Sequence, residues 1–209
     1  MELLPNKSAA LIVGRPRGEK SIFANQFLAD GIKDNDSTVY VVSNTFPENI
    51  TERLVRAVGN NDIKNFRIVD CYTVHSGIDK IDDEIILRVS GPYALHEISI
   101  ALTKLVKAMN MPFRIVFDSL STLLLHNKLN EIEEFLQLNI RKLKRVDATI
   151  LFLIEEGMHN EKEFALLETL TDITLRFNSD EKIISYKKFG EETRIKYRLE
   201  DGRIDLEAM

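Results

Sequence analysis

The sequence predicts an α/β fold: a mostly parallel central sheet with helices on both faces and antiparallel strands near the C-terminus. Short apolar runs alternate with amphipathic stretches from residue 9 to residue 170, which is typical of parallel strands joined by helices. The first apolar run leads into a Gly-rich turn that opens a helix. Residues 173–206 consist of short strand-like runs separated by turn residues.

Length and composition favour one globular domain over residues 1–209, because the 209 residues are 44% hydrophobic and contain no internal repeat or low-complexity linker. No apolar run approaches the ~18 residues of a membrane span, and the N-terminal residues do not resemble a secretory signal. Cys71 is the only cysteine, so an intrachain disulfide is excluded and we expect a cytoplasmic protein. The net charge of −5 argues against a dedicated nucleic-acid binder.

The N-terminal third is expected to form three strands and two helices. We place strands at residues 9–13, 39–43 and 66–70, and helices at residues 20–32 and 47–58. The second strand is rich in β-branched and aromatic residues, which suits a buried position. Gly31 and the Asp34–Asp36 segment are expected to end the first helix, and Pro47 suits the first turn of the second.

The remainder is expected to continue the alternation and then change to antiparallel strands. Residues 72–83 form the longest irregular stretch, and residues 85–89 are either a short strand or the end of that stretch. We place helices at 93–110, 131–146 and 161–170, and strands at 113–117 and 149–154, with a loop after Asp118. Four late strands, at 173–177, 183–188, 195–199 and 204–206, predict a meander on the sheet edge.

The segment from Leu11 to Ser21 has the layout of a phosphate-binding P-loop, which requires Gly, four residues, then Gly-Lys-Ser/Thr. Gly14, Lys20 and Ser21 fit this pattern, but Glu19 stands where the second Gly belongs. In such a loop the backbone N–H groups and the helix N-terminus bind phosphate. Lys20 would reach the terminal phosphates and the Ser21 hydroxyl would bind Mg²⁺.

Glu19 opposes phosphate binding, because two like charges ~4 Å apart near a protein surface repel by ~4 kcal/mol before screening. A rotation of the Glu19 side chain toward solvent would remove most of this penalty, and Arg15 and Arg17 offset the charge in part. The alternative is a plain strand-to-helix turn, in which Gly14 and Gly18 serve backbone geometry and Glu19 favours the helix N-terminus.

Asp118 ends an apolar strand and has the form of a Walker B carboxylate, which supports Mg²⁺ or its water shell. The alternative is that Asp118 caps the turn that follows. The carboxylate that would orient an attacking water is missing after the second strand, where Asn44 and Thr45 stand. Glu48, Glu155 and Glu156 are then either substitute bases or solvated charges.

The remaining polar residues carry weaker signals. The histidines are isolated in the sequence, without a zinc pattern, and we expect surface or loop positions for His75, His96, His126 and His159. Lys142, Lys144 and Arg145 suit a helix C-terminus. A second basic group lies on the late strands and either contacts phosphate or a neighbouring subunit or forms a solvated face: Lys187, Lys188, Arg194, Lys196 and Arg198.

Several segments, in order along the chain, resemble the RecA superfamily, and within it the KaiC-like branch of archaeal and bacterial proteins that includes archaeal recombinase paralogues. The matching segments are Phe23–Ile32, Val39–Val42 with Pro47–Ile50, Pro92–Ile100, Arg114–Ser121 and Glu168–Leu175. The similarity covers about residues 9–205. It implies a RecA-like P-loop fold, an ATP site with Mg²⁺, and head-to-tail homo-oligomers.

The departures from the family pattern concern the chemistry. Lys20, Ser21 and Asp118 match, whereas Glu19 replaces the family's Gly and Asn44 and Thr45 occupy the positions of its paired catalytic glutamates. The usual N-terminal segment before the first strand is nearly absent. Lys187 and Lys188 fall near the family's basic residues that reach the nucleotide of the adjacent subunit.

These losses favour a RecA-fold protein that binds nucleotide only, or not at all, and regulates or scaffolds a protein partner, because general-base assistance contributes ~10²–10⁴ in rate. If nucleotide binds, Gly14, Gly18, Lys20, Ser21 and Asp118 hold ATP, the last two through Mg²⁺. One alternative is a slow ATPase with Glu48, Glu155 or Glu156 as base. Another is a recombination accessory that binds single-stranded DNA, although the chain is acidic and has 8% aromatic residues without Trp.

Overall fold

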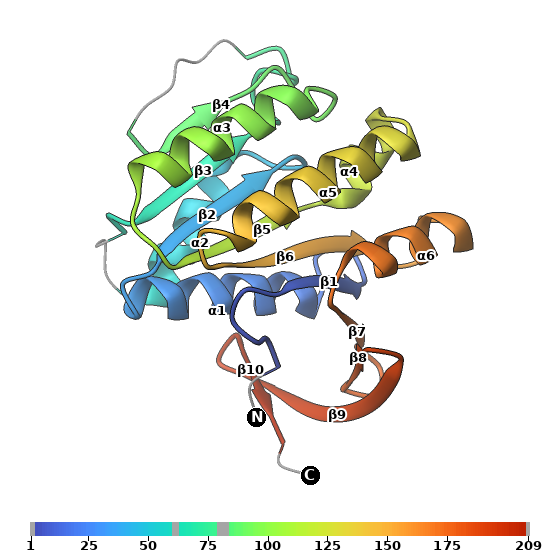
Figure 1. Cartoon of the computed structure of the whole chain (residues 1–209). Helices are drawn as coiled ribbons and strands as arrows, with labels where there is room; N and C mark the ends of the chain where they lie inside the picture. Colours follow the sequence, from blue (N-terminus) through green and yellow to red (C-terminus); the bar gives the residue numbers. More distant parts are fainter. Residues whose placement is uncertain (1–2, 60–62, 79–83, 208–209) are drawn as a thin grey trace.

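The computed structural model describes residues 3–59, 63–78 and 84–207, and these residues form an α/β fold around one ten-stranded sheet (Figure 1). The strand order is β10-β9-β8-β7-β1-β6-β5-β2-β3-β4. The parallel part comprises β1 (Ala9–Gly14), β2 (Ser37–Val42), β3 (Phe66–Asp70), β4 (Ile86–Arg88), β5 (Phe113–Asp118), β6 (Ala148–Glu155) and β7 (Ile173–Asn178). The predicted fold class is confirmed.

Helices cover both faces of this sheet (Figure 1). One face packs against α1 (Glu19–Lys33) and α2 (Pro47–Val58). The other packs against α3 (Leu95–Ala108), α4 (Leu120–His126), α5 (Leu129–Lys144) and α6 (Glu161–Leu170). Among the described residues, no helix is both long and apolar enough to cross a membrane.

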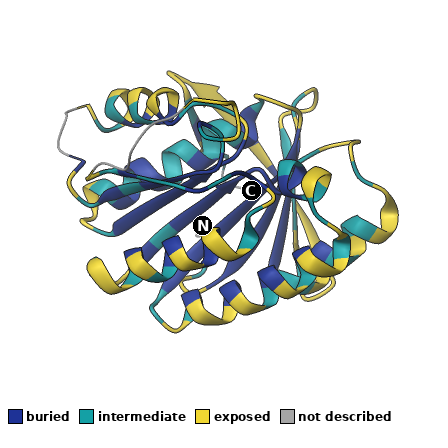
Figure 2. Ribbon diagram, turned by 90° about the horizontal axis from the view of Figure 1, so that it is seen from above, coloured by how far each residue is buried: buried dark blue, intermediate teal, exposed yellow. Residues whose placement is uncertain are grey.

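Strand β1 shows how the sequence produces two cores. Its residues alternate between the faces, so that Leu11 and Val13 join the cluster under α3–α6 while Ala10 and Ile12 join the cluster under α1 and α2. Every residue of β1 is buried, which explains its unbroken apolar sequence. The central strands are buried along their length and the outer surfaces of the helices are exposed (Figure 2).

Helix α4 corrects the loop that the sequence analysis placed after Asp118. Its Leu120 and Leu123 are buried in the core, and Ser119 caps it by accepting a hydrogen bond from the Thr122 backbone N–H at 3.3 Å. The helix has seven residues, too few for a clear helical periodicity in the sequence. Residues 86–88 pair with β3, which resolves the choice left open for residues 85–89 in favour of a strand.

Gly31 does not end α1, contrary to the sequence analysis. The helix continues to Lys33, and a Cβ atom on Gly31 would lie 2.6 Å from Cδ of Arg114. The glycine therefore provides space for the Arg114 side chain, whose guanidinium binds Asp34 and Asp36 at 2.6 and 2.7 Å. This close approach fixes the C-terminal end of α1 against β5.

The predicted antiparallel meander is confirmed in β8 (Ile183–Lys188), β9 (Glu191–Glu200) and β10 (Arg203–Leu206). Strand β7 pairs parallel with β1 and antiparallel with β8, so it joins the two parts of the sheet. Gln26 of α1 fixes β10 by hydrogen bonds to the Ile204 backbone N and O, at 2.8 and 3.2 Å. The predicted irregular stretch at residues 72–83 lies partly outside the described residues.

Candidate functional site

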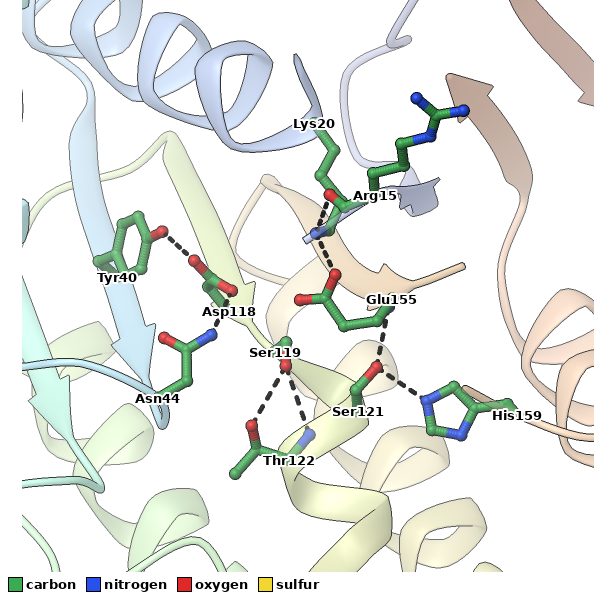
Figure 3. A network of polar contacts seen from close by, with 10 residues as sticks. All are labelled: Arg15, Lys20, Tyr40, Asn44, Asp118, Ser119, Ser121, Thr122, Glu155 and His159. Atoms are coloured by element: carbon green, nitrogen blue, oxygen red, sulfur yellow. Dashed lines mark hydrogen bonds and ion pairs between the residues drawn. The ribbon is translucent and has the colours of Figure 1, made fainter. Parts of the chain in front are cut away.

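The candidate site lies where the carboxyl ends of neighbouring parallel strands meet (Figure 3). Gly14 of β1 is paired in register with Glu155 of β6, and Val42 of β2 is paired with Asp118 of β5. The topology therefore brings the predicted P-loop, the predicted Walker B strand and the acidic end of β6 to one edge of the sheet.

The predicted P-loop forms a tight turn between β1 and α1. The Gly18 N–H donates to the Arg15 carbonyl at 3.1 Å, and Gly18 precedes α1 as its N-cap. A Cβ atom on Gly18 would lie 3.1 Å from the Arg15 carbonyl oxygen, so a larger residue would crowd the turn. Arg17 adopts the left-handed conformation with φ of 54°. The Ser21 N–H donates back to the Gly18 carbonyl at 3.0 Å.

Lys20 points into the protein and binds Glu155. Its Nζ lies 2.5 Å from Oε2 of Glu155 and 3.0 Å from the Arg15 carbonyl oxygen (Figure 3). The Lys20 side chain is 1% exposed and that of Glu155 is 12% exposed, so this is a buried ion pair. Glu155 was expected to be either a substitute base or a solvated charge; the solvated position is wrong, because Lys20 binds it.

The Glu19 side chain also points into the protein, so the rotation toward solvent considered in the sequence analysis is wrong. Its carboxylate accepts hydrogen bonds from Lys182 Nζ at 2.7 Å and Ser179 Oγ at 2.5 Å, both beyond the end of β7. Burial raises the pKa of Glu19, but the hydrogen bonds from Lys182 and Ser179 outweigh it and lower the pKa to about 2. Burial and the charge of Glu19 raise the pKa of nearby Tyr197 to about 12.

A further ion pair connects the loop to the same turn. The Arg15 guanidinium binds both carboxylate oxygens of Asp180, and this bond raises the pKa of Arg15. The turn between β7 and β8 therefore carries partners for both Arg15 and Glu19. Arg15, Glu19 and Lys20 are therefore each paired with a side chain of this chain, whereas exposed Arg17 has no partner among the described residues.

Asp118 is held by two donors from β2 and the segment after it. Tyr40 donates its hydroxyl proton to Oδ2 at 2.7 Å, and Asn44 donates from Nδ2 to Oδ1 at 3.1 Å (Figure 3). Asp118 is 7% exposed. Burial of Tyr40 and the negative charge of Asp118 raise the pKa of the Tyr40 hydroxyl well above its ordinary value. Because Ser119 caps α4, the alternative in which Asp118 caps the turn is wrong.

A second network of polar contacts begins at the backbone N–H of Glu155. Ser121 Oγ accepts the Glu155 N–H at 2.8 Å and lies 2.8 Å from Nε2 of His159, whose Nδ1 lies 3.4 Å from Oε2 of Glu163 on α6. His159 lies in the loop between β6 and α6, as one of the two expected positions, but its side chain is only 5% exposed. These contacts connect the end of β6 to the start of α6.

The other predicted residues lie apart from this centre. Glu156 pairs with Arg176 at 3.4 Å, and the Thr45 hydroxyl accepts a hydrogen bond from Asn49 at 2.9 Å. The late basic group is partly neutralised, since Lys187 binds Glu168 at 2.8 Å and Arg198 binds Glu207 at 2.7 Å. His75 and His126 are exposed neighbours with ring centroids 5.1 Å apart. Within the described residues, no three His, Cys, Asp or Glu side chains are grouped as a metal site.

A family model described as the KaiC ATPase matches residues 2–194, which is most of the chain. The chain belongs to the KaiC family of ATPases. A solved structure of the KaiC-like protein PH0186 from Pyrococcus horikoshii is similar over 98% of this chain and 91% of that chain, with a TM-score of 0.67. Its sequence identity of 17% supports the shared fold alone.

A curated relative of this KaiC-family chain is the UPF0273 protein PAE3143 from Pyrobaculum aerophilum. It is 31% identical over 127 residues, which cover 58% of this chain. The match spans 44% of the relative, so this chain corresponds to less than half of that protein. The relative's printed name states no substrate or partner.

Sequence reasoning on this KaiC-family chain found Lys20 and Asp118 but missed the partners of both. Glu155 was visible as an acid at a strand end, although its ion pair with Lys20 depends on the register of β1 and β6. Tyr40 was read as a core residue; a hydroxyl in the middle of a buried strand is the signal that it needs a polar partner.

Proposed function

We propose that this chain is a KaiC-family domain that does not turn over ATP and acts by regulating or scaffolding a protein partner. The observation that carries the proposal is the buried ion pair between Lys20 and Glu155. In an active P-loop the lysine ammonium is available for the terminal phosphates. Here the ammonium is bound by a carboxylate of the same chain.

The residues as arranged do not fit Mg·ATP. Lys20 is bound by Glu155, and the Asp118 oxygens accept hydrogen bonds from Tyr40 and Asn44. The Glu19 carboxylate adds a negative charge at the helix N-terminus, where phosphate oxygens would lie. Asn44 has no carboxylate with which to accept a proton from water. Of these contacts, the pair with Glu155 opposes binding most, because it occupies the ammonium that would bind the terminal phosphates.

Titration calorimetry with Mg·ATP tests the proposal. We expect little or no heat of binding for the natural chain and a measurable affinity for Glu155→Gln, in which Lys20 loses its charged partner. Glu156→Gln is the matched control, because its carboxylate pairs with Arg176 rather than Lys20. We also expect that adding Glu19→Gly and Asn44→Glu to Glu155→Gln strengthens binding first and allows hydrolysis second.

An assay of phosphate release from ATP distinguishes the proposal from the alternative of a slow ATPase. Glu155 is the substitute base that the position beside Lys20 favours. If the natural chain releases phosphate and Glu155→Gln does not, Glu155 is that base and the proposal is wrong. If neither variant releases phosphate, the proposal stands. The homo-oligomer, the protein partner, the DNA-binding alternative and the cytoplasmic location stay predictions.

A further inference from the structure

We propose that a hollow between α1, α2 and the turn connecting β9 to β10 binds a small phosphate-bearing ligand. The hollow has a volume of about 310 Å³ and is separate from the predicted P-loop, although α1 contributes to both. Arg53 and Arg56 of α2 and Arg203 of β10 line it. The volume lies at the lower end of the range of small-molecule pockets.

The positive charges of this hollow are incompletely paired. The Arg53 side chain makes no hydrogen bond or ion pair with any residue in the described part of the chain. Arg56 pairs with Glu52 at 3.4 Å, and both side chains are largely exposed, so the pair is weak. Arg203 binds Asp30 at 3.1 Å with both partners about two-fifths exposed. An incoming anion would meet one guanidinium group without a partner among the described residues and two loosely held ones.

The lining also provides uncharged groups and one opposing charge. Asn25 of α1 lines the hollow, and its side-chain oxygen is buried without a hydrogen-bond partner among the described residues. This oxygen accepts hydrogen bonds, so it suits a hydroxyl or N–H group of the ligand or an ordered water, while the phosphate oxygens themselves face the arginines. Asp201 also lines the hollow, which leaves a net lining charge of three arginines against one carboxylate.

Phosphate chemistry fits this set better than other anions or a long polyanion. Guanidinium groups bind phosphate oxygens through paired N–H donors, and several arginines together favour a ligand with more than one negative charge. Nucleic acid would need an extended basic surface, whereas this chain carries a net charge of −5. The ligand class is therefore a compact, multiply charged phosphate compound.

Titration with inorganic tripolyphosphate tests the proposal, with calorimetry for affinity and backbone amide NMR for location. We expect binding that weakens about tenfold in Arg53→Gln, since a hydrogen bond to a charged group contributes this much. We expect Asp201→Asn to bind a few-fold more tightly, because it removes a like charge and Asn tolerates the positive φ of 47° at this position. Arg145→Gln, which removes an exposed arginine beyond α5, should change the affinity less than twofold.

The NMR spectrum separates this hollow from the P-loop. We expect the largest shift changes at Asn25, Arg53 and Gly202, and small changes at Gly14 and Gly18. Largest changes in the P-loop, an unchanged affinity in Arg53→Gln, or no binding at low salt would each overturn the proposal. Binding of an acidic peptide in the absence of tripolyphosphate binding would overturn it as well, because the site would then recognise a protein.

Discussion

Helix α1 contacts two charged regions that differ in how their charges are satisfied. At its N-terminus, Lys20 and Glu19 are both bound by side chains of the same chain. One to two turns further along, Asn25 lines the hollow in which Arg53 makes no ion pair with a described residue. The difference teaches that a motif alone does not leave a charge available to a ligand, since Glu19 and Lys20 of the motif are bound within the chain while Arg53 outside it has no partner among the described residues.

The largest expected effect comes from breaking the pair at the N-terminus of α1. Glu155→Gln leaves the buried Lys20 ammonium without a charged partner, and we expect the free energy of unfolding to fall by about 3 kcal/mol. Urea denaturation of both proteins measures this. Glu156→Gln is the control, and its half-exposed pair predicts a change below about 0.5 kcal/mol. Equal losses of unfolding free energy in Glu155→Gln and Glu156→Gln would contradict the distinction between the buried pair and the half-exposed pair.

The pH dependence of stability sharpens the same comparison through Glu19. Its pKa is lowered from 4.5 to about 2 by folding, so the carboxylate stabilises the fold above pH 4.5, and this contribution is lost as the pH falls toward 2. The shift corresponds to roughly 3 kcal/mol. We expect Glu19→Gln to lose less stability than the natural chain between these pH values in urea denaturation. If the unfolding free energies of the two proteins fell in parallel with pH, the Glu19 carboxylate would not form its bonds to Lys182 and Ser179 in solution.

A smaller effect is expected at the Walker B position. Tyr40→Phe removes the hydrogen bond to the Asp118 carboxylate, and we expect a loss of about 1–2 kcal/mol. Tyr186→Phe is the matched control, because its hydroxyl bonds to no residue in the described ranges. Thermal unfolding measures both, and a larger loss for Tyr186→Phe would contradict the assignment.

The smallest effect on stability is expected in the arginine-lined hollow. Arg53→Gln removes a charge that no described residue pairs with, so the free energy of unfolding should change by less than about 0.5 kcal/mol. Chemical denaturation in the absence of phosphate measures this. A clear destabilisation would show that Arg53 supports the fold and that the contrast with Lys20 is wrong.

The sequence predicted most of the fold because its elements are marked by strong local patterns. The bounds of α2, β3, β8 and α6 agree with the prediction, and Pro47 and the left-handed Gly59 mark both ends of α2. Helix α4 was missed because it is short. The end of α1 was predicted to within one residue, but the role of Gly31 was not, because it depends on Arg114, a distant residue. Contacts between residues far apart in sequence leave no local pattern.

The candidate site was predictable in position but not in its pairing. The motif located Lys20 and Glu19, and the strand ending located Asp118. Their partners are contributed by other strands and by the turn after β7, more than 70 residues away in sequence. The sequence analysis therefore predicted which residues meet at this edge of the sheet, while the partners that bind those residues became visible only with the sheet register.

The most direct test of the central claim is phosphate release from excess Mg·ATP by the natural chain, compared with Glu19→Gly/Asn44→Glu/Glu155→Gln. The account predicts no release above background by the natural chain and measurable release by the triple variant, in which the P-loop glycine and the carboxylate are restored and Lys20 has lost its charged partner. Turnover by the natural chain at a rate near that of a KaiC-family ATPase with both features would contradict it.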